Sequence, residues 1–130
     1  MPIKRVLCPQ RVRNIPAQFS WVDHRLVRDR HIDRCDAQAA ALYLFLVTVA
    51  DAQGLSYYSD AVLARRLSMR PVRLSQARAD LLRAQLIAYQ RPLYQVLALD
   101  GPLAVPAREL GADESGARIG QLRAALGRAP

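Results

Sequence analysis

The feature that most constrains this chain is the order of elements predicted by residues 54–99. A β-rich run after Gly54 predicts a short strand. Ser59 and Asp60 are both favoured helix-start residues, and either can cap a short helix that follows. Apolar residues recur along that helix at helical spacing, at Val62, Leu63 and Leu67. The stretch is therefore expected to open with a strand and a short amphipathic helix.

A longer second helix is predicted after a tight turn at residues 68–70. Pro71 suits its first position, where a missing backbone N–H costs nothing. The side predicted to pack inward carries Leu74, Ala77, Leu81 and Leu82. The opposite side carries Arg70, Arg73, Gln76 and Asp80, with Arg78 at its edge. The pattern predicts an exposed polar face that is rich in arginine.

Two β-rich runs close the stretch, at residues 87–90 and 94–99, and Arg91-Pro92 can turn between them. They predict a short antiparallel hairpin whose tip offers one cation, Arg91. The expected fold class is mainly α-helical with a small antiparallel β-hairpin or sheet.

Residues 37–50 are apolar on all sides of a predicted helix, and Asp36 is its expected N-cap. The run is too short to span a bilayer, so we interpret it as a buried central helix. Such a helix needs cover on most sides. The expected cover is a short amphipathic helix over residues 21–29, capped by Ser20. Its apolar members are Trp21, Val22, Leu26 and Val27.

The charge distribution and the prolines and glycines suggest three parts. A net charge of +8 favours an anionic partner, most often nucleic acid. Residues 1–18 are expected to form a basic extended arm with four cations and no acid: Lys4, Arg5, Arg11 and Arg13. Such arms enter a DNA minor groove, and a solubilising tail is the alternative. Residues 19–100 form the predicted domain, and 101–130 a flexible linker with a short helix at 115–126.

Four phrases resemble the winged helix-turn-helix domains of plasmid and phage replication-initiator proteins: FSWVDHRLVRD, DAQAAALYLFL, LSYYSDAVLARRLS and LLRAQLIAY. The phrases GLSYY and LIAYQRPLYQVLAL are also similar to small helix-turn-helix proteins encoded beside bacterial insertion sequences. The resemblance covers residues 19–99 and implies a winged helix whose second helix lies in a DNA major groove. Two positions depart from that pattern. Gln85 replaces the usual glycine before the Leu-Ile pair, and Arg70-Pro71 replaces the usual small polar start of the recognition helix.

The predicted function is duplex DNA binding, either sequence-specific or semi-specific. Besides the arm, the predicted DNA contacts are Arg70, Arg73, Ser75, Gln76, Arg78 and Arg91. The expected role is accessory to, or regulatory for, a mobile element, plasmid replication or transcription. The alternative is a protein–protein adaptor of the same fold, with helix 37–50 or helix 115–126 as its contact. The oligomeric state stays open, with a homodimer as one option, and no small-molecule ligand or cofactor is predicted.

Catalytic and metal chemistry are not expected. His24, His31 and Cys35 would share one face only in a continuous helix, and a fourth zinc ligand is not evident. Salt bridges with interleaved arginines, and helix capping, are favoured over a nuclease cluster for Asp23, Asp29, Asp33 and Asp36. Two cysteines, with no secretory signal and no membrane segment, predict a cytoplasmic location.

Overall fold

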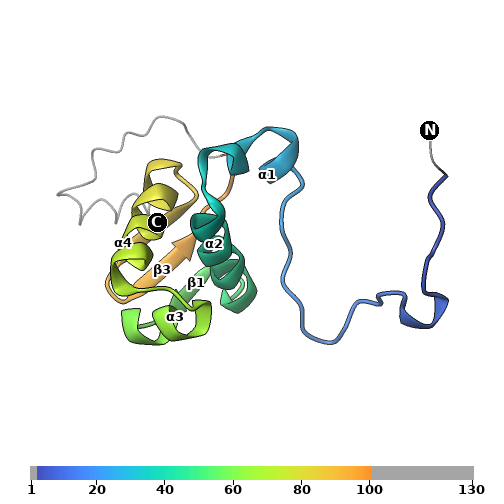
Figure 1. The fold of residues 1–130 in the computed structure, drawn as a ribbon, viewed down its shortest axis with the longest axis horizontal. Helices are drawn as coiled ribbons and strands as arrows, with labels where there is room; N and C mark the ends of the chain where they lie inside the picture. The colour runs from blue at the N-terminus through green and yellow to red at the C-terminus, as the bar shows by residue number, and fades with distance from the viewer. Residues whose placement is uncertain (1–2, 101–130) are drawn as a thin grey trace. The chain divides into compact units, whose positions relative to one another are not determined.

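The computed structural model describes residues 3–100 of the chain (Figure 1). The helices and strands that it describes lie in the first of two compact units, Met1–Leu97. In chain order they are η1 (Pro9–Arg11), α1 (Arg25–Arg28), η2 (His31–Arg34), α2 (Ala37–Val49), β1 (Leu55–Tyr57), α3 (Asp60–Leu67), α4 (Pro71–Arg83), β2 (Ile87–Gln90) and β3 (Leu93–Val96), where η marks a 3₁₀ helix. The predicted class, mainly helical with a small antiparallel sheet, is confirmed for these residues.

The three strands form one antiparallel sheet in the order β1–β3–β2. The predicted hairpin is β2 and β3, although β3 ends at Val96 and not at residue 99. β1 pairs with the other edge of β3, and just before it the Gly54 carbonyl accepts the Val96 N–H at 2.8 Å. A Cβ at Gly54 would stand 2.6 Å from the Val96 carbonyl oxygen, and φ is +86° there, so this position requires glycine.

Helix α2 is central to the hydrophobic core. Asp36 caps it as predicted, because its carboxylate accepts the Ala39 N–H at 2.8 Å. The helix packs mainly against α4 and also contacts β3. Both helices contribute leucines with no solvent exposure: Leu42 and Leu46 from α2, and Leu74 and Leu81 from α4. The prediction of a buried central helix is confirmed.

Helices α3 and α4 are joined by the predicted turn at residues 68–70. The Ser59 hydroxyl caps α3, and Ser68 ends it in a left-handed conformation with φ of 55°. Helix α4 begins at Pro71 as predicted, and its inward face is confirmed for Leu74, Ala77 and Leu81. The prediction is wrong for Leu82, which is 40% exposed. Its side chain is turned by about 100° from that of its buried neighbour, as helix geometry requires.

The first of the two departures from the winged helix-turn-helix sequence pattern lies at the C-terminal end of α4. Gln85, at the position of the usual glycine, has a left-handed φ of 61°. Its N–H bonds to the Leu82 carbonyl, and the Leu86 N–H bonds to the Leu81 carbonyl. These are the two bonds of a Schellman helix end. Because a Cβ is unfavourable in this conformation, the helix end forms with Gln85 at a cost in stability.

The helix predicted over residues 21–29 is wrong in its extent, since α1 spans only Arg25–Arg28. Ser20 does not cap it, because the Ser20 hydroxyl donates to the Thr48 carbonyl of α2 at 2.9 Å. The Asp23 carboxylate instead accepts the first backbone N–H of α1, at 2.9 Å. A side chain that bonds its own local backbone in this way sets a later helix start than periodicity predicts.

The cover of α2 is correspondingly incomplete. Of the apolar residues expected to cover it, Leu26 is buried, whereas Trp21 is 74%, Val22 45% and Val27 67% exposed. Leu44 on α2 itself is 61% exposed. One side of an otherwise buried helix therefore remains uncovered within the described residues.

The two ends of the chain contribute little regular structure to this description. Residues 3–18 are exposed throughout, and η1 is the one helix or strand among them. The predicted linker and helix at 101–130 lie outside the described residues. Within residues 3–100, no helix combines the length and the apolar composition that a membrane crossing requires.

Replacing Leu46 with Ala should lower the free energy of unfolding by about 2–5 kcal/mol, because this fully buried side chain leaves a cavity behind. Leu82→Ala is the matched control. The same change at a side chain that is 40% exposed should cost less than about 1 kcal/mol. Urea unfolding followed by circular dichroism measures both values. Equal losses would contradict the placement of α2 in the core.

Replacing Gln85 with Gly should raise the free energy of unfolding by up to about 1 kcal/mol. Relief of about 1–2 kcal/mol at a left-handed residue exceeds the roughly 0.4–1 kcal/mol of unfolded-state entropy that glycine adds. Gln76→Gly, the same change inside α4, should instead lower it by about 1 kcal/mol. Thermal unfolding of both variants distinguishes the two signs, and a loss of stability at Gln85 would contradict the helix end described above.

Candidate nucleic-acid interface

One group of arginines in the described residues is paired with carboxylates. The ion pairs are Arg25–Asp23, Arg28–Asp29, Arg30–Asp33, Arg78–Asp60 and Arg83–Asp80. The side-chain hydrogen bond from Arg25 lowers the pKa of Asp23 to about 2. With Asp36 as the cap of α2, the predicted salt bridging and capping by these aspartates is confirmed. The positive charges of this group are balanced locally.

A second group has no carboxylate partner within residues 3–100, and four of its members lie where α3 ends and α4 begins. We call them the α3–α4 basic surface: Arg65, Arg66, Arg70 and Arg73. All four side chains are exposed. The short turn at residues 68–70 joins the last turn of α3 to the start of α4, so the four positive charges fall within one short stretch of the chain.

Each member of this surface has a distinct setting. Arg70 is the N-cap residue of α4, and its side chain caps nothing. The Arg66 guanidinium lies 5.8 Å from the centre of the Phe45 ring, within reach of a cation–π contact. Arg73 donates to the Gln76 side-chain oxygen at 3.0 Å.

The predicted polar face of α4 is confirmed at its first turns. Arg73, Ser75 and Gln76 are all exposed, and Arg73 and Gln76 lie one turn apart. Arginine and glutamine at such positions can read guanine and adenine edges in a major groove. Asp80, which the sequence placed on the same face, is only partly exposed and pairs with Arg83 in the last turn.

Arg78 lies elsewhere than the sequence pattern suggested. Its side chain is 12% exposed and donates to the Asp60 carboxylate at 2.9 and 3.3 Å. It also donates to the Tyr94 hydroxyl at 2.8 Å and stacks 4.5 Å from the centre of the Tyr89 ring. Arg78 therefore joins α4 to the start of α3 and to the hairpin, and its guanidinium is occupied by protein partners.

The pKa values of this cluster reflect its burial and its hydrogen bonds. Burial disfavours the charged form of Arg78, but the hydrogen bonds that Arg78 donates to Asp60 and Tyr94 outweigh this effect and raise the pKa of Arg78 above its ordinary value. Burial also raises the pKa of Tyr94, against the opposing effect of Arg78. Both raised pKa values favour a charged Arg78 beside a neutral Tyr94, whose hydroxyl oxygen accepts the hydrogen bond.

The remaining residues predicted to contact DNA are exposed and lie outside α4. Arg91 is exposed in the turn between β2 and β3. The arm cations are exposed as well, namely Lys4, Arg5, Arg11 and Arg13. No described hydrogen bond or ion pair links them to α4. The structure thus shows that they are accessible, and it does not assemble them with the α3–α4 basic surface.

The histidine and cysteine side chains that could bind zinc only from one continuous helix are not aligned on such a helix. The helix that would align His24, His31 and Cys35 is interrupted, because α1 ends before Arg30 and that residue is left-handed with φ of 66°. The His31 ring lies 3.1 Å from the Arg34 guanidinium. Among residues 3–100 no cluster of histidine, cysteine and acidic side chains is arranged to hold a metal ion.

Arg65 and Arg66 are the residues that sequence reasoning missed. No contact was predicted for them, whereas the structure exposes both in the last turn of α3, one short turn before α4 begins. A signal was present, since two adjacent arginines end a helix just before a tight turn.

Comparison with known proteins identified no relative of this chain. No family model matches the chain, and no curated protein and no solved structure shows significant similarity to it. Functional inference therefore depends on the arrangement of the residues described above.

Replacing Arg78 with Met should lower the free energy of unfolding by about 1–3 kcal/mol, because the buried Tyr94 hydroxyl loses its hydrogen-bond partner. Tyr94→Phe should cost about 1 kcal/mol. The double variant should lose less than the sum of the two, since both partners of the bond are then absent. Urea unfolding of the three variants gives the coupling energy, and strictly additive losses would contradict the assigned contact.

Proposed function

We propose that this chain binds duplex DNA as a winged-helix protein, with α4 as the recognition helix and the β2–β3 hairpin as the wing. The order of α2, β1, α3, α4, β2 and β3, with β3 central in the sheet, supports this assignment. The observation that carries it is the sorting of the arginines. Outside the α3–α4 basic surface, the described arginines have carboxylate or histidine partners or lie in the arm and the hairpin turn. The four arginines of the surface have no carboxylate partner within residues 3–100.

The electrostatics of the α3–α4 basic surface favour an anionic ligand. The N-terminus of a helix carries a partial positive charge, so Arg70 and Arg73 in or beside the first turn of α4 are placed unfavourably in the free protein. Arg65 and Arg66 add two further like charges nearby. DNA phosphates would reverse the sign of these interactions, and release of their counterions would add to the affinity.

The residues divide into two kinds of contact. Arg73 and Gln76 lie where an inserted helix would read base edges, and Ser75 lies beside them. Arg65, Arg66, Arg70 and Arg91 would contact phosphates. Pro71 has no N–H to offer at the start of α4, so side chains must supply the phosphate contacts there. The arm would add its cations in the minor groove.

The proposed DNA binding also points to a role in the cell. We infer an accessory or regulatory function for a mobile element, plasmid replication or transcription, exercised in the cytoplasm where such DNA resides. Arg78 is left out of the contacts, because its guanidinium is bound within the protein. The rival function, an adaptor without DNA readout, predicts no salt-dependent affinity for any duplex.

Selection from a random duplex library supplies the target, and the variants are then tested on it. Arg73→Ala should weaken binding by about 1–3 kcal/mol and relax specificity at one base pair. Arg65→Ala should weaken binding to all sequences and make the slope of log K against log salt shallower by about 0.9. Arg83→Ala, in the last turn of the same helix and paired with Asp80, should leave both unchanged.

Fluorescence anisotropy over a range of salt concentrations measures these effects. Absence of any enriched duplex, together with salt-independent binding, would overturn the proposed function. Equal effects of Arg73→Ala and Arg83→Ala would overturn the assignment of α4's first turns as the contact surface.

A further inference from the structure

The strongest feature outside the basic surface is an apolar face around α1 and α2. Its exposed members are Trp21, Val22, Val27 and Leu44, which are 74, 45, 67 and 61% exposed. The hydrogen bond from the Ser20 hydroxyl to the Thr48 carbonyl ties the segment before α1 to α2. Val22 and Leu44 also line one cavity, and exposed apolar side chains that adjoin in this way mark interaction sites.

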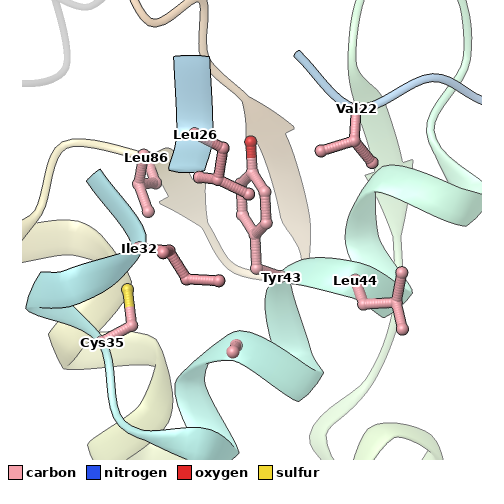
Figure 2. Close-up of a pocket in the computed structure, with 8 residues that line it drawn as sticks. Val22, Leu26, Ile32, Cys35, Tyr43, Leu44 and Leu86 are labelled. Carbon is pink, nitrogen blue, oxygen red and sulfur yellow. The ribbon is translucent and has the colours of Figure 1, made fainter. Parts of the chain in front are cut away.

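A cavity of about 240 Å³ opens on this same face. Its walls come from the segment before α1, from α1, η2 and the residue after η2, from α2, and from the turn between α4 and β2: Val22, Leu26, Ile32, Cys35, Ala40, Tyr43, Leu44 and Leu86. Figure 2 shows Val22 and Leu44 on one side of Tyr43 and Cys35 on the other. Because Val22 and Leu44 are exposed as well as lining the cavity, its mouth lies at the surface. The walls are almost wholly apolar, so the fitting occupant is an apolar group.

The net charge of the segment that forms this face bears on which kind of partner can dock there. Residues 19–50 hold four aspartates and four arginines and are formally neutral, whereas the whole chain carries +8. Three of these arginines are paired with neighbouring aspartates, as described above. Two copies of a strongly basic chain repel each other over most of their surface. Residues 19–50 add no net charge to that repulsion, whereas an acidic partner or nucleic acid gains no net attraction from them.

We propose that a second copy of this chain docks on the α1–α2 face, with Trp21 of each copy seated in the cavity of the other. A two-fold contact requires one surface to carry both complementary parts. This face does so, since the exposed Trp21 directly precedes Val22 at the cavity mouth. A tryptophan buried in an apolar pocket of its partner is a common hot spot of a protein–protein interface. The proposal does not depend on DNA binding.

Trp21 is the single tryptophan of the chain and reports its own environment. Sedimentation equilibrium of the full chain should show a monomer–dimer equilibrium, and the Trp21 emission should shift to shorter wavelength along the same concentration curve. Leu44→Glu places a charge at the cavity mouth and should weaken dimerisation at least about 30-fold, as loss of an interface hot spot does. Trp21→Ala should have a similar effect by sedimentation.

Tyr57→Ala is the control, because Tyr57 is 71% exposed on β1, outside the α1–α2 face. It should leave the dimer unchanged. Circular dichroism and unfolding of each variant as a monomer show that the fold is retained. A chain that stays monomeric at high concentration, or a dimer unaffected by Leu44→Glu in a folded variant, would overturn the proposal. So would a Trp21 emission that does not change with concentration, which would indicate another occupant or none.

Discussion

Helix α2 has apolar side chains on every side, and the rest of the described fold depends on how they are covered. The leucines of α4 and the central strand β3 cover most of them. Packing against α2 fixes the rotation of α4 about its own axis. Once Leu74 and Leu81 point inward, helical periodicity turns Arg73 and Gln76 toward solvent. The exposed polar face is thus a consequence of the buried one.

The arginines show how one residue type serves two purposes. Arg78 connects α4 with α3 and the hairpin through a carboxylate, a phenol and an aromatic ring. Within residues 3–100 the members of the α3–α4 basic surface have no such acidic partners, and two of them, Arg70 and Arg73, lie at the start of α4, where the helix dipole disfavours a cation. A protein that stabilised only itself would gain by pairing these charges. An anionic ligand would supply the missing partner, and we propose that this ligand is duplex DNA.

The incomplete cover of α2 gives the molecule a second surface of different character. One side of the helix is left with exposed apolar residues because the preceding segment forms only a short helix, α1. The neutral charge balance there contrasts with the basic surface at α3 and α4. With separate apolar and basic surfaces, the proposed self-association and the proposed DNA binding would not compete for the same residues. A dimer would also present two copies of α4, as two half-sites in DNA require.

The sequence by itself determined the elements whose signals are local. Asp36, Ser59 and Pro71 mark helix starts, alternating β-rich runs mark the hairpin, and periodicity identifies the inward side of α4, apart from Leu82 at its edge. Tertiary structure alone decided three matters. It placed Asp60 and Tyr94 beside Arg78, contacts between residues 18 and 16 positions apart that no local pattern specifies. It bonded the Ser20 hydroxyl to the Thr48 carbonyl of α2, 28 positions away, where the local pattern predicted a helix cap. It brought β1 to the edge of β3, since strand pairing depends on the path of the chain between them.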